Sequence, residues 1–208
     1  MEKQGILFIV SGPSGSGKDT VLARVFEKCP ELSFSISSIT RPMRAGEREG
    51  EKYHFISSAE FERMIAEDKL LEHNVFIGNY YGTPREPVER CIETGGDIIV
   101  EVDVNGAAQI RSRCPEAVSI FIMPPSLKVL RERLSGRGTE SAEQVEGRLK
   151  SALEEIARAG EYDYIITNGQ LETAVEDVIT VIKADRLSIC RRRGIIDEIL
   201  AKANNERN

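Results

Sequence analysis

The segment that most constrains the fold is the glycine-rich stretch Gly12-Pro-Ser-Gly-Ser-Gly17-Lys18, which fits the pattern G-x-x-x-x-G-K. It follows a short apolar run, Ile6–Val10, whose length and composition predict a strand buried on both faces. An amphipathic helix is expected after the loop, ending before Pro30. Glycines at this junction let consecutive backbone N–H groups point at one anion. The stretch therefore predicts a phosphate-binding loop in which Lys18 reaches the β- and γ-phosphates of a nucleotide.

The rest of the chain alternates short apolar runs with amphipathic segments. Further buried strands are expected at 98–102, 118–123 and 165–167, and helices near 88–92, 127–134, 145–156 and 172–189. Ser57 and Ser126 match the pattern of residues that cap a helix N-terminus. Strands alternating with helices predict an α/β protein with a mainly parallel sheet. We therefore expect a three-layer α/β/α core of the P-loop type.

Two stretches fit this alternation poorly. Residues 33–86 are polar and strand-rich, with one half-exposed strand expected at 33–40. Residues 126–158 are predicted to form a charged helical hairpin around a glycine-rich turn. Ligand sites of α/β proteins lie at the carboxyl ends of the strands, so we interpret both stretches as insertions that flank the site. The core would then comprise the remaining segments, 1–32, 87–125 and 159–208.

The charge, the length of the first apolar run and the cysteine spacing argue against several classes of protein. The 208-residue chain has a formal net charge of −6, whereas a general nucleic-acid binder is more often basic. The first apolar run is too short for a signal-peptide core or a membrane span. The four cysteines are scattered without a C-x-x-C pair, which favours reduced thiols over a disulfide framework. We expect a cytoplasmic protein without a nucleic-acid or membrane partner, and its oligomeric state, monomer or homodimer, stays open.

Several further motifs follow the loop. They are Ser37-Ser-Ile-Thr-Arg41-Pro-Met-Arg44-Ala-Gly-Glu47, Tyr53-His-Phe55, Glu72, Gly78-Asn-Tyr-Tyr81-Gly82-Thr83, Glu101-Val-Asp103-Val-Asn-Gly-Ala107 and Gly136-Arg137-Gly-Thr-Glu140. In order and spacing the chain resembles the guanylate kinase family from about Gly5 to Asp185. The resemblance implies phosphoryl transfer from ATP to GMP, and also to dGMP, with Mg²⁺ as cofactor. It also implies that the insertion at 33–86 binds GMP and that the hairpin at 126–158 is a lid over ATP.

The resemblance assigns roles to individual residues. For ATP binding it implies Gly12, Pro13, Ser14, Gly15, Ser16, Gly17, Lys18, Asp19, Thr20, Arg133, Arg137 and Asn168. For the GMP phosphate it implies Arg41, Arg44, Tyr53 and Tyr81, and for the guanine base Ser37, Glu72 and Thr83. Asp103 is expected to approach the bound nucleotide. The residues expected to neutralise charge on the transferred group are Lys18, Arg41, Arg137 and Arg148.

The residue types suit this chemistry. Guanine presents N1–H and N2–H₂ as neighbouring donors that one carboxylate, such as Glu72, accepts together, whereas adenine offers a lone pair at N1. Two arginines three residues apart, Arg41 and Arg44, can clamp one phosphate bidentately. The phosphate of GMP has a second pKa of ~6 and is already anionic near neutral pH. Transfer therefore needs alignment and charge neutralisation rather than a strong general base.

One position departs from the usual loop motif. Asp19 stands where Ser or Thr normally helps to hold Mg²⁺, and the hydroxyl of Thr20 follows it. Mg²⁺ is therefore expected to bind through water and phosphates, near Asp19, Thr20 and Asp103.

Other interpretations stay open at this point. Glu72 could be an exposed acid, Tyr53 and Tyr81 core side chains with a hydroxyl in water, and Arg131 and Arg133 part of a solvated helix face. Two other functions also stay open: a guanylate-kinase-like protein-interaction module without catalysis, and a kinase for another nucleoside monophosphate. The intact Lys18 argues against the first, and the pairing of Glu72 with neighbouring hydroxyls argues against the second.

Overall fold

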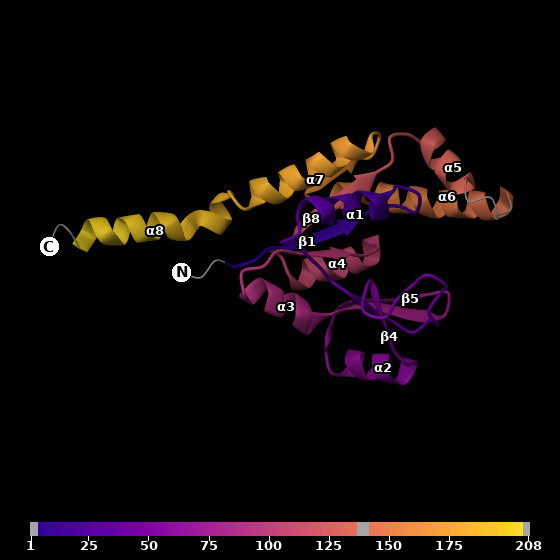
Figure 1. Ribbon diagram of the computed structural model, residues 1–208, viewed down its shortest axis with the longest axis horizontal. Helices are drawn as coiled ribbons and strands as arrows, with labels where there is room; N and C mark the ends of the chain where they lie inside the picture. The colour runs from indigo at the N-terminus through magenta and orange to yellow at the C-terminus, as the bar shows by residue number, and fades with distance from the viewer. Residues whose placement is uncertain (1–3, 137–141, 206–208) are drawn as a thin grey trace.

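The central element of the computed structural model (Figure 1) is a parallel sheet. Its strand order is β2-β7-β1-β8-β9. The structure describes residues 4–136 and 142–205. The strands of this sheet are β1 (Leu7–Ser11), β2 (Ser33–Phe34), β7 (Ile98–Glu101), β8 (Val118–Met123) and β9 (Tyr164–Thr167). Every residue of β1 is buried because this strand lies between two neighbours and under helices on both sides. The strands predicted at 6–10, 98–102, 118–123 and 165–167 are confirmed.

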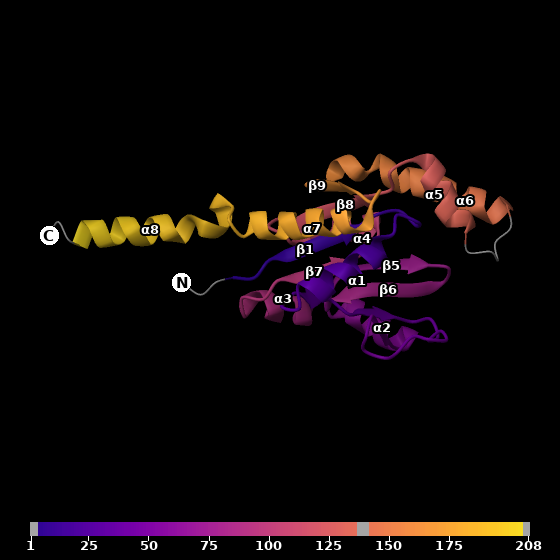
Figure 2. The ribbon, with the colours of Figure 1, turned by 45° about the horizontal axis from the view of Figure 1, so that its top comes forward.

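Helices cover both faces of the sheet, which confirms the predicted three-layer α/β/α core (Figure 2). Their bounds are α1 (Lys18–Lys28), α3 (Arg85–Glu93), α4 (Val104–Arg113) and α7 (Leu171–Asp185). Alternate residues of β1 face different layers. Phe8 and Val10 belong to the buried cluster with α1 and α7, whereas Ile9 belongs to the cluster with α3 and α4. Because both of its faces are buried, β1 has a fixed position, and so does the start of the glycine-rich loop that follows it.

A second, mainly antiparallel sheet with the order β4-β3-β6-β5 lies beside the core. Its elements are β3 (Ser37–Ile39), β4 (Tyr53–Phe55), β5 (Leu70–Phe76), β6 (Asn79–Pro84) and the helix α2 (Ser58–Ala66). The side chain of Ser57 caps α2 by accepting the N–H of Glu60 at 3.1 Å, as predicted. Phe61 of α2 is fully buried and its ring stacks on Tyr80 of β6 at 5.0 Å. This contact fastens the helix to the sheet.

The prediction of one strand at 33–40 is wrong. The segment forms two short strands, because the backbone changes partner in the middle. Ser35 N donates to Ile99 O at 2.9 Å in the central sheet, whereas Ser37 N donates to Lys52 O at 3.2 Å in the second sheet. Alternating apolar residues indicate extended backbone but not which sheet it joins.

The charged hairpin consists of α5 (Leu127–Ser135) and α6 (Ala142–Ala157), followed by a short 3₁₀ helix at Ala159–Glu161. Leu130, Leu134 and Leu149 form its buried seam. Ser126 caps α5 by accepting the N–H of Val129 at 3.2 Å, which confirms the prediction. The hairpin therefore has an apolar cluster of its own.

The last helical region also differs from the prediction. Instead of one helix over 172–189, α7 ends at Asp185 and a separate helix, α8 (Ile189–Asn205), follows. The turn between them forms where Leu187 N donates to Ala184 O at 2.9 Å and Ser188 N donates to Asp185 O at 3.0 Å. None of the described helices, α8 included, combines the length and apolar character needed to cross a lipid bilayer.

Asp97 connects three elements, so we expect Asp97→Ala to destabilise the fold. The buried carboxylate accepts Ile6 N, just before β1, at 3.0 Å and lies 2.5 Å from Nη2 of Arg186 at the end of α7. Losing a buried ionic partner typically costs about 3–5 kcal/mol. Urea denaturation of the variant and of a surface control, Glu27→Ala, measures the change in free energy of unfolding. A loss below about 1 kcal/mol for Asp97→Ala would contradict this role.

Candidate active site

The glycine-rich loop lies between β1 and α1, as predicted. Gly15 and Gly17 have φ angles of 86° and 84°, in the left-handed region that glycine tolerates best. A Cβ at Gly17 would also lie 2.4 Å from Nδ2 of Asn168. Helix α1 begins at Lys18, so the unpaired N–H groups of its first turn belong to the loop. The loop thus has the backbone geometry of an anion site at a helix N-terminus.

Lys18 pairs with carboxylates in this structure. Its Nζ donates to Oε1 of Glu101 at the end of β7 and lies 3.9 Å from Oδ1 of Asp19. Lys52, from the second sheet, approaches the same Asp19 oxygen at 3.7 Å. Burial raises the pKa of Glu101, and a hydrogen bond with Glu101 lowers the pKa of Asp19. The acid at position 19 is therefore part of a compact cluster of two carboxylates and two lysines.

The hairpin reaches the loop directly. Nη2 of Arg148, on α6, donates to Oγ of Ser14 at 2.6 Å. Arg133, on α5, donates to the carbonyl oxygens of Ser16 and Asn168, each at 3.0 Å. The amide of Asn168 also donates to Ser16 O, at 2.8 Å. Arg133 is thus engaged in contacts with the loop, which excludes its interpretation as part of a solvated helix face.

A cavity of ≈ 770 Å³ opens beside the loop, within the size range of ligand pockets. It brings together the predicted residues Gly12, Pro13, Ser14, Gly15, Ser16, Gly17, Lys18, Asp19, Thr20, Tyr53, Asp103, Arg133 and Asn168. Arg137, predicted to contact the same phosphates, lies outside the described residues. The cavity therefore gathers most of the predicted ATP side at the carboxyl ends of β1 and β7.

Arg41 is held by an internal carboxylate. Its Nη1 and Nη2 donate to the two carboxylate oxygens of Glu47 at 2.7 and 2.6 Å, and Nη1 also donates to Pro42 O at 3.0 Å. The guanidinium lies 5.3 Å from the centre of the Tyr53 ring. This bidentate pairing lowers the pKa of Glu47 to about 2 and raises that of Arg41. Arg41 therefore stays charged although only 8% of it is exposed.

The other predicted phosphate contacts are less enclosed. The side chain of Arg44 is exposed, and its backbone N–H donates to Oε2 of Glu47 at 2.8 Å. Tyr81 lies on β6, and its ring packs edge-on against Phe76 at 6.4 Å. Tyr53 and Tyr81 are both half-buried, so a packing role for their rings and a phosphate contact through their hydroxyls both stay open.

Glu72 is a buried carboxylate on β5, with only 5% of the residue exposed. Thr83 on β6 donates its hydroxyl to Oε1 at 2.7 Å. Gly106 of α4 leaves room for the other oxygen, because a Cβ there would lie 2.8 Å from Oε2. Burial raises the pKa of Glu72 to about 7, with a smaller contribution from Asp103. The interpretation of Glu72 as an exposed acid is therefore wrong.

The predicted base contacts do not all meet. Thr83 is fully buried and its hydroxyl is engaged by Glu72. Ser37 is half-buried on β3, where it pairs in register with Tyr53 of β4. Within the described residues, the lining of the 770 Å³ cavity includes none of Ser37, Glu72 and Thr83. These three residues therefore belong to a region separate from the cavity, and Tyr53 and Asp103 of the cavity wall lie next to that region.

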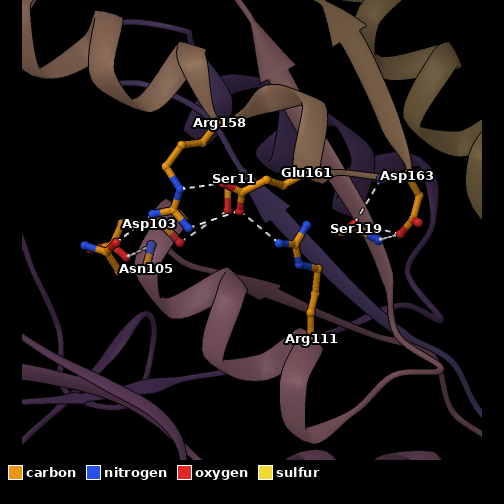
Figure 3. A network of polar contacts seen from close by, with 8 residues as sticks. All are labelled: Ser11, Asp103, Asn105, Arg111, Ser119, Arg158, Glu161 and Asp163. Atoms are coloured by element: carbon orange, nitrogen blue, oxygen red, sulfur yellow. Dashed lines mark hydrogen bonds and ion pairs between the residues drawn. The ribbon is translucent and has the colours of Figure 1, made fainter.

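Asp103 connects the two regions. Its Oδ1 caps α4 by accepting the N–H groups of Asn105 and Gly106 at 2.9 and 2.8 Å, and its Oδ2 accepts from Asn74 of β5 at 2.8 Å. Figure 3 shows how this turn continues to the hairpin: Arg158, just after α6, donates to Oδ1 of Asn105 at 2.7 Å. The second sheet and the hairpin thus meet at one turn of the core.

Three acids of the site were not predicted to have a role. They are Glu47, which holds Arg41; Glu101, which pairs with Lys18; and Glu155 of α6, which lines the cavity and whose pKa is raised by burial. The position of Glu101 at the end of an apolar run next to the loop was a usable signal, since parallel strands end at the same edge of a sheet. Glu155 has no comparable signal, because it resembles any other acid of a charged helix.

Glu72 should make stability depend on pH. Its folded pKa of about 7 exceeds the ordinary value of 4.5. Between these values the folded protein holds the extra proton, so the free energy of unfolding falls as the pH rises through this window. Glu72→Gln removes this titration and should be more stable than the parent at about pH 8, by up to about 3 kcal/mol, with a much smaller difference at about pH 5. Urea denaturation at both pH values tests this, and an equal difference at both would contradict the raised pKa.

Comparison with known proteins agrees with this geometry. A family model described as guanylate kinase matches residues 4–185. The guanylate kinase of Carboxydothermus hydrogenoformans is 47% identical over 184 residues, 88% of this chain and 90% of that protein. That of Neisseria gonorrhoeae is 44% identical over 198 residues, 95% and 97% of the two chains. The crystal structure of guanylate kinase from Anaplasma phagocytophilum superposes with a TM-score of 0.76 at 31% identity, covering 92% of this chain and 91% of that one. The chain belongs to the guanylate kinase family.

Proposed function

We propose that the protein transfers the γ-phosphoryl group of ATP to GMP, and also to dGMP. The observation that carries this proposal is the buried carboxylate of Glu72, held by Thr83 beside the core turn at Asp103. In its ionised form it can accept the N1–H and N2–H₂ donors of guanine together. An adenine base would leave the buried carboxylate without donors, which strongly disfavours AMP.

The donor side would use the loop and the hairpin. ATP phosphates would lie on the N–H groups of Gly12–Thr20, with Lys18 moving from Glu101 to the β- and γ-phosphates. Arg148 already contacts the loop at Ser14, so we assign it to the transferred group. Arg133 and Asn168 would support the loop through its Ser16 carbonyl. Arg137 keeps the role that the family resemblance implies.

Mg²⁺ is the proposed cofactor. When bound beside the loop, it would supply positive charge to offset the charge that develops on the transferred group. The hard oxygen donors beside the loop, from Asp19, Thr20, Glu101 and Asp103, suit this ion. In the described part of the chain, no three acidic, His or Cys side chains form a ready-made cage. Residues 12–20 therefore fit an ion held mainly by phosphates and water.

The acceptor side is assigned to the second sheet with α2, and the lid to α5 and α6. The GMP phosphate would bind Arg41 together with Arg44, Tyr53 and Tyr81. Arg41 has five N–H donors, and Glu47 takes one edge of its guanidinium, so donors remain for a phosphate. Domain closure would then align the two substrates and exclude water as a competing acceptor. The turn at Asp103, which contacts both moving parts, would be the hinge region.

The proposal is tested by measuring ADP release from ATP and Mg²⁺ with GMP, dGMP, AMP, CMP and UMP in parallel. GMP and dGMP should support turnover and the other three should not. Glu72→Gln should lower kcat/KM for GMP about 100-fold or more, because the amide presents a donor where guanine needs an acceptor. Its KM for ATP should be unchanged. Turnover of another monophosphate would overturn the base assignment, and GMP binding without turnover would indicate an interaction module.

Lys18→Ala should remove most of the catalytic rate. A positioned charge on the transferred phosphates is commonly worth about 10²–10³ in kcat. Circular dichroism should show an intact fold, since Lys18 lies in the first turn of α1 and forms no part of the core. The matched control is Lys52→Ala, which removes a neighbouring cation outside the loop and should reduce kcat far less. Equal losses for the two variants would contradict the special role of Lys18.

Glu47→Ala should raise KM for GMP by about tenfold with a smaller effect on kcat, because Arg41 would lose the partner that orients it. Steady-state kinetics with GMP as the varied substrate measures this split. Glu51→Ala, an exposed acid on the same insertion, is the control. A lower KM for GMP in Glu47→Ala would show that Glu47 competes with the substrate rather than positioning Arg41.

A further inference from the structure

Helix α8 extends away from the rest of the chain beyond the end of α7 (Figures 1 and 2). Its first turn is anchored, because Nε of Arg191 donates to Oδ2 of Asp185 at 3.0 Å. Beyond this anchor, the ion pairs among the described side chains from Gly194 to Lys202 stay within α8, where Lys202 pairs with Glu198 at 2.7 Å. The helix is thus fixed at its start and stands apart from the core along the rest of its length.

The apolar side chains of α8 are open to solvent. The exposed fractions are 68% for Ile189, 50% for Ile195, 45% for Ile196, 62% for Ile199 and 57% for Leu200. Ile196 lies seven residues after Ile189, and Ile199 and Leu200 lie three and four residues after Ile196, so these four residues fall along one side of a helix. Branched apolar residues gathered in this way on a monomer mark an interaction surface rather than the ordinary scatter of surface residues.

The charges of α8 are arranged so that the helix is complementary to itself. Arg192 and Arg193 lie in its first half, and Asp197 and Glu198 follow in the second half. If two copies pair in antiparallel orientation, the basic half of each lies beside the acidic half of the other. A two-fold arrangement centred near Ile195 places Arg193 opposite Asp197 of the second copy, twice.

The attachment of α8 to the core favours the same orientation. Each helix joins its own core at the N-terminal end, through Asp185 and Arg191. In a parallel pair both cores would lie at the same end and compete for space. In an antiparallel pair they lie at opposite ends of a helix about 25 Å long.

The apolar area suits a modest interface. The four aligned side chains, each about half exposed or more, offer roughly 450 Å² per copy, so pairing would remove about 900 Å² from water, an area typical of weak, transient interfaces. A membrane surface fits less well, because Asp197 and Glu198 interrupt the basic residues that anionic lipids attract.

We propose that α8 mediates homodimerisation, with the helices of two copies packed in antiparallel orientation through their apolar sides and with Arg193 of each paired to Asp197 of the other. The dimer lies outside the nucleotide site and does not depend on the reaction proposed above. An interface of this area is expected to dissociate in the micromolar range.

Sedimentation velocity of the full chain at about 1–100 µM tests the proposal. The parent should be a reversible dimer at the upper end of this range, and Ile196→Asp should be monomeric throughout. Arg193→Glu and Asp197→Arg should each weaken the dimer about tenfold, and the double variant should restore it. Glu31→Arg, an exposed charge reversal distant in sequence from α8, is the control and should remain dimeric.

A parent that is monomeric at 100 µM would overturn the proposal, as would a monomer that binds vesicles containing phosphatidylserine. Failure of the double charge reversal to restore the dimer would overturn the antiparallel register. Circular dichroism and kinase activity at nanomolar concentration should be unchanged in every variant, since these substitutions lie outside the site. An inactive but dimeric parent would contradict the proposed function while leaving this proposal intact.

Discussion

The burial of one carboxylate, that of Glu72, is the interaction on which the proposed acceptor side of the molecule depends. Its desolvation is only partly offset by the hydroxyl of Thr83, so its pKa rises to about 7. The rest of the fold has to compensate for this desolvation free energy, because β5 and β6 enclose the carboxylate. Gly106 leaves space for its second oxygen. A base with two adjacent donors would stabilise the ionised form, so the proposed recognition of guanine would use the same carboxylate whose burial costs the unliganded fold stability.

The cationic groups of the site are paired with carboxylates of the same chain. Lys18 pairs with Glu101 and Arg41 with Glu47, at positions where the family resemblance places substrate phosphates. Charged groups near a cavity wall gain stability from such partners. Substrate binding would affect the two pairs differently. Lys18 has a flexible side chain and can exchange Glu101 for a phosphate. Arg41 is buried and bound to Glu47 through two hydrogen bonds, so it would keep Glu47 and bind a phosphate with its remaining N–H donors.

Local patterns predicted local structure well. The glycine-rich loop, the strands around it and the caps at Ser57 and Ser126 all depend on short-range chemistry and are confirmed. The errors arise where tertiary context decides. Residues 33–40 change from one sheet to the other. Helix α4 was not predicted because Gly106 and the small residues after it weaken its apolar pattern, and α8 was not predicted because it lacks core contacts. Burial of Glu72 likewise depends on a residue 34 positions away, Gly106, and no spacing rule reveals that contact.

Proton release on GMP binding tests the central claim most directly. Isothermal titration calorimetry near pH 7 in buffers of different ionisation enthalpy counts the protons that leave the complex. If guanine binds an ionised Glu72 whose pKa is about 7, the parent should release about half a proton more than Glu72→Gln measured with the same nucleotide. Equal proton release by the parent and a Glu72→Gln variant that still binds GMP would contradict the account.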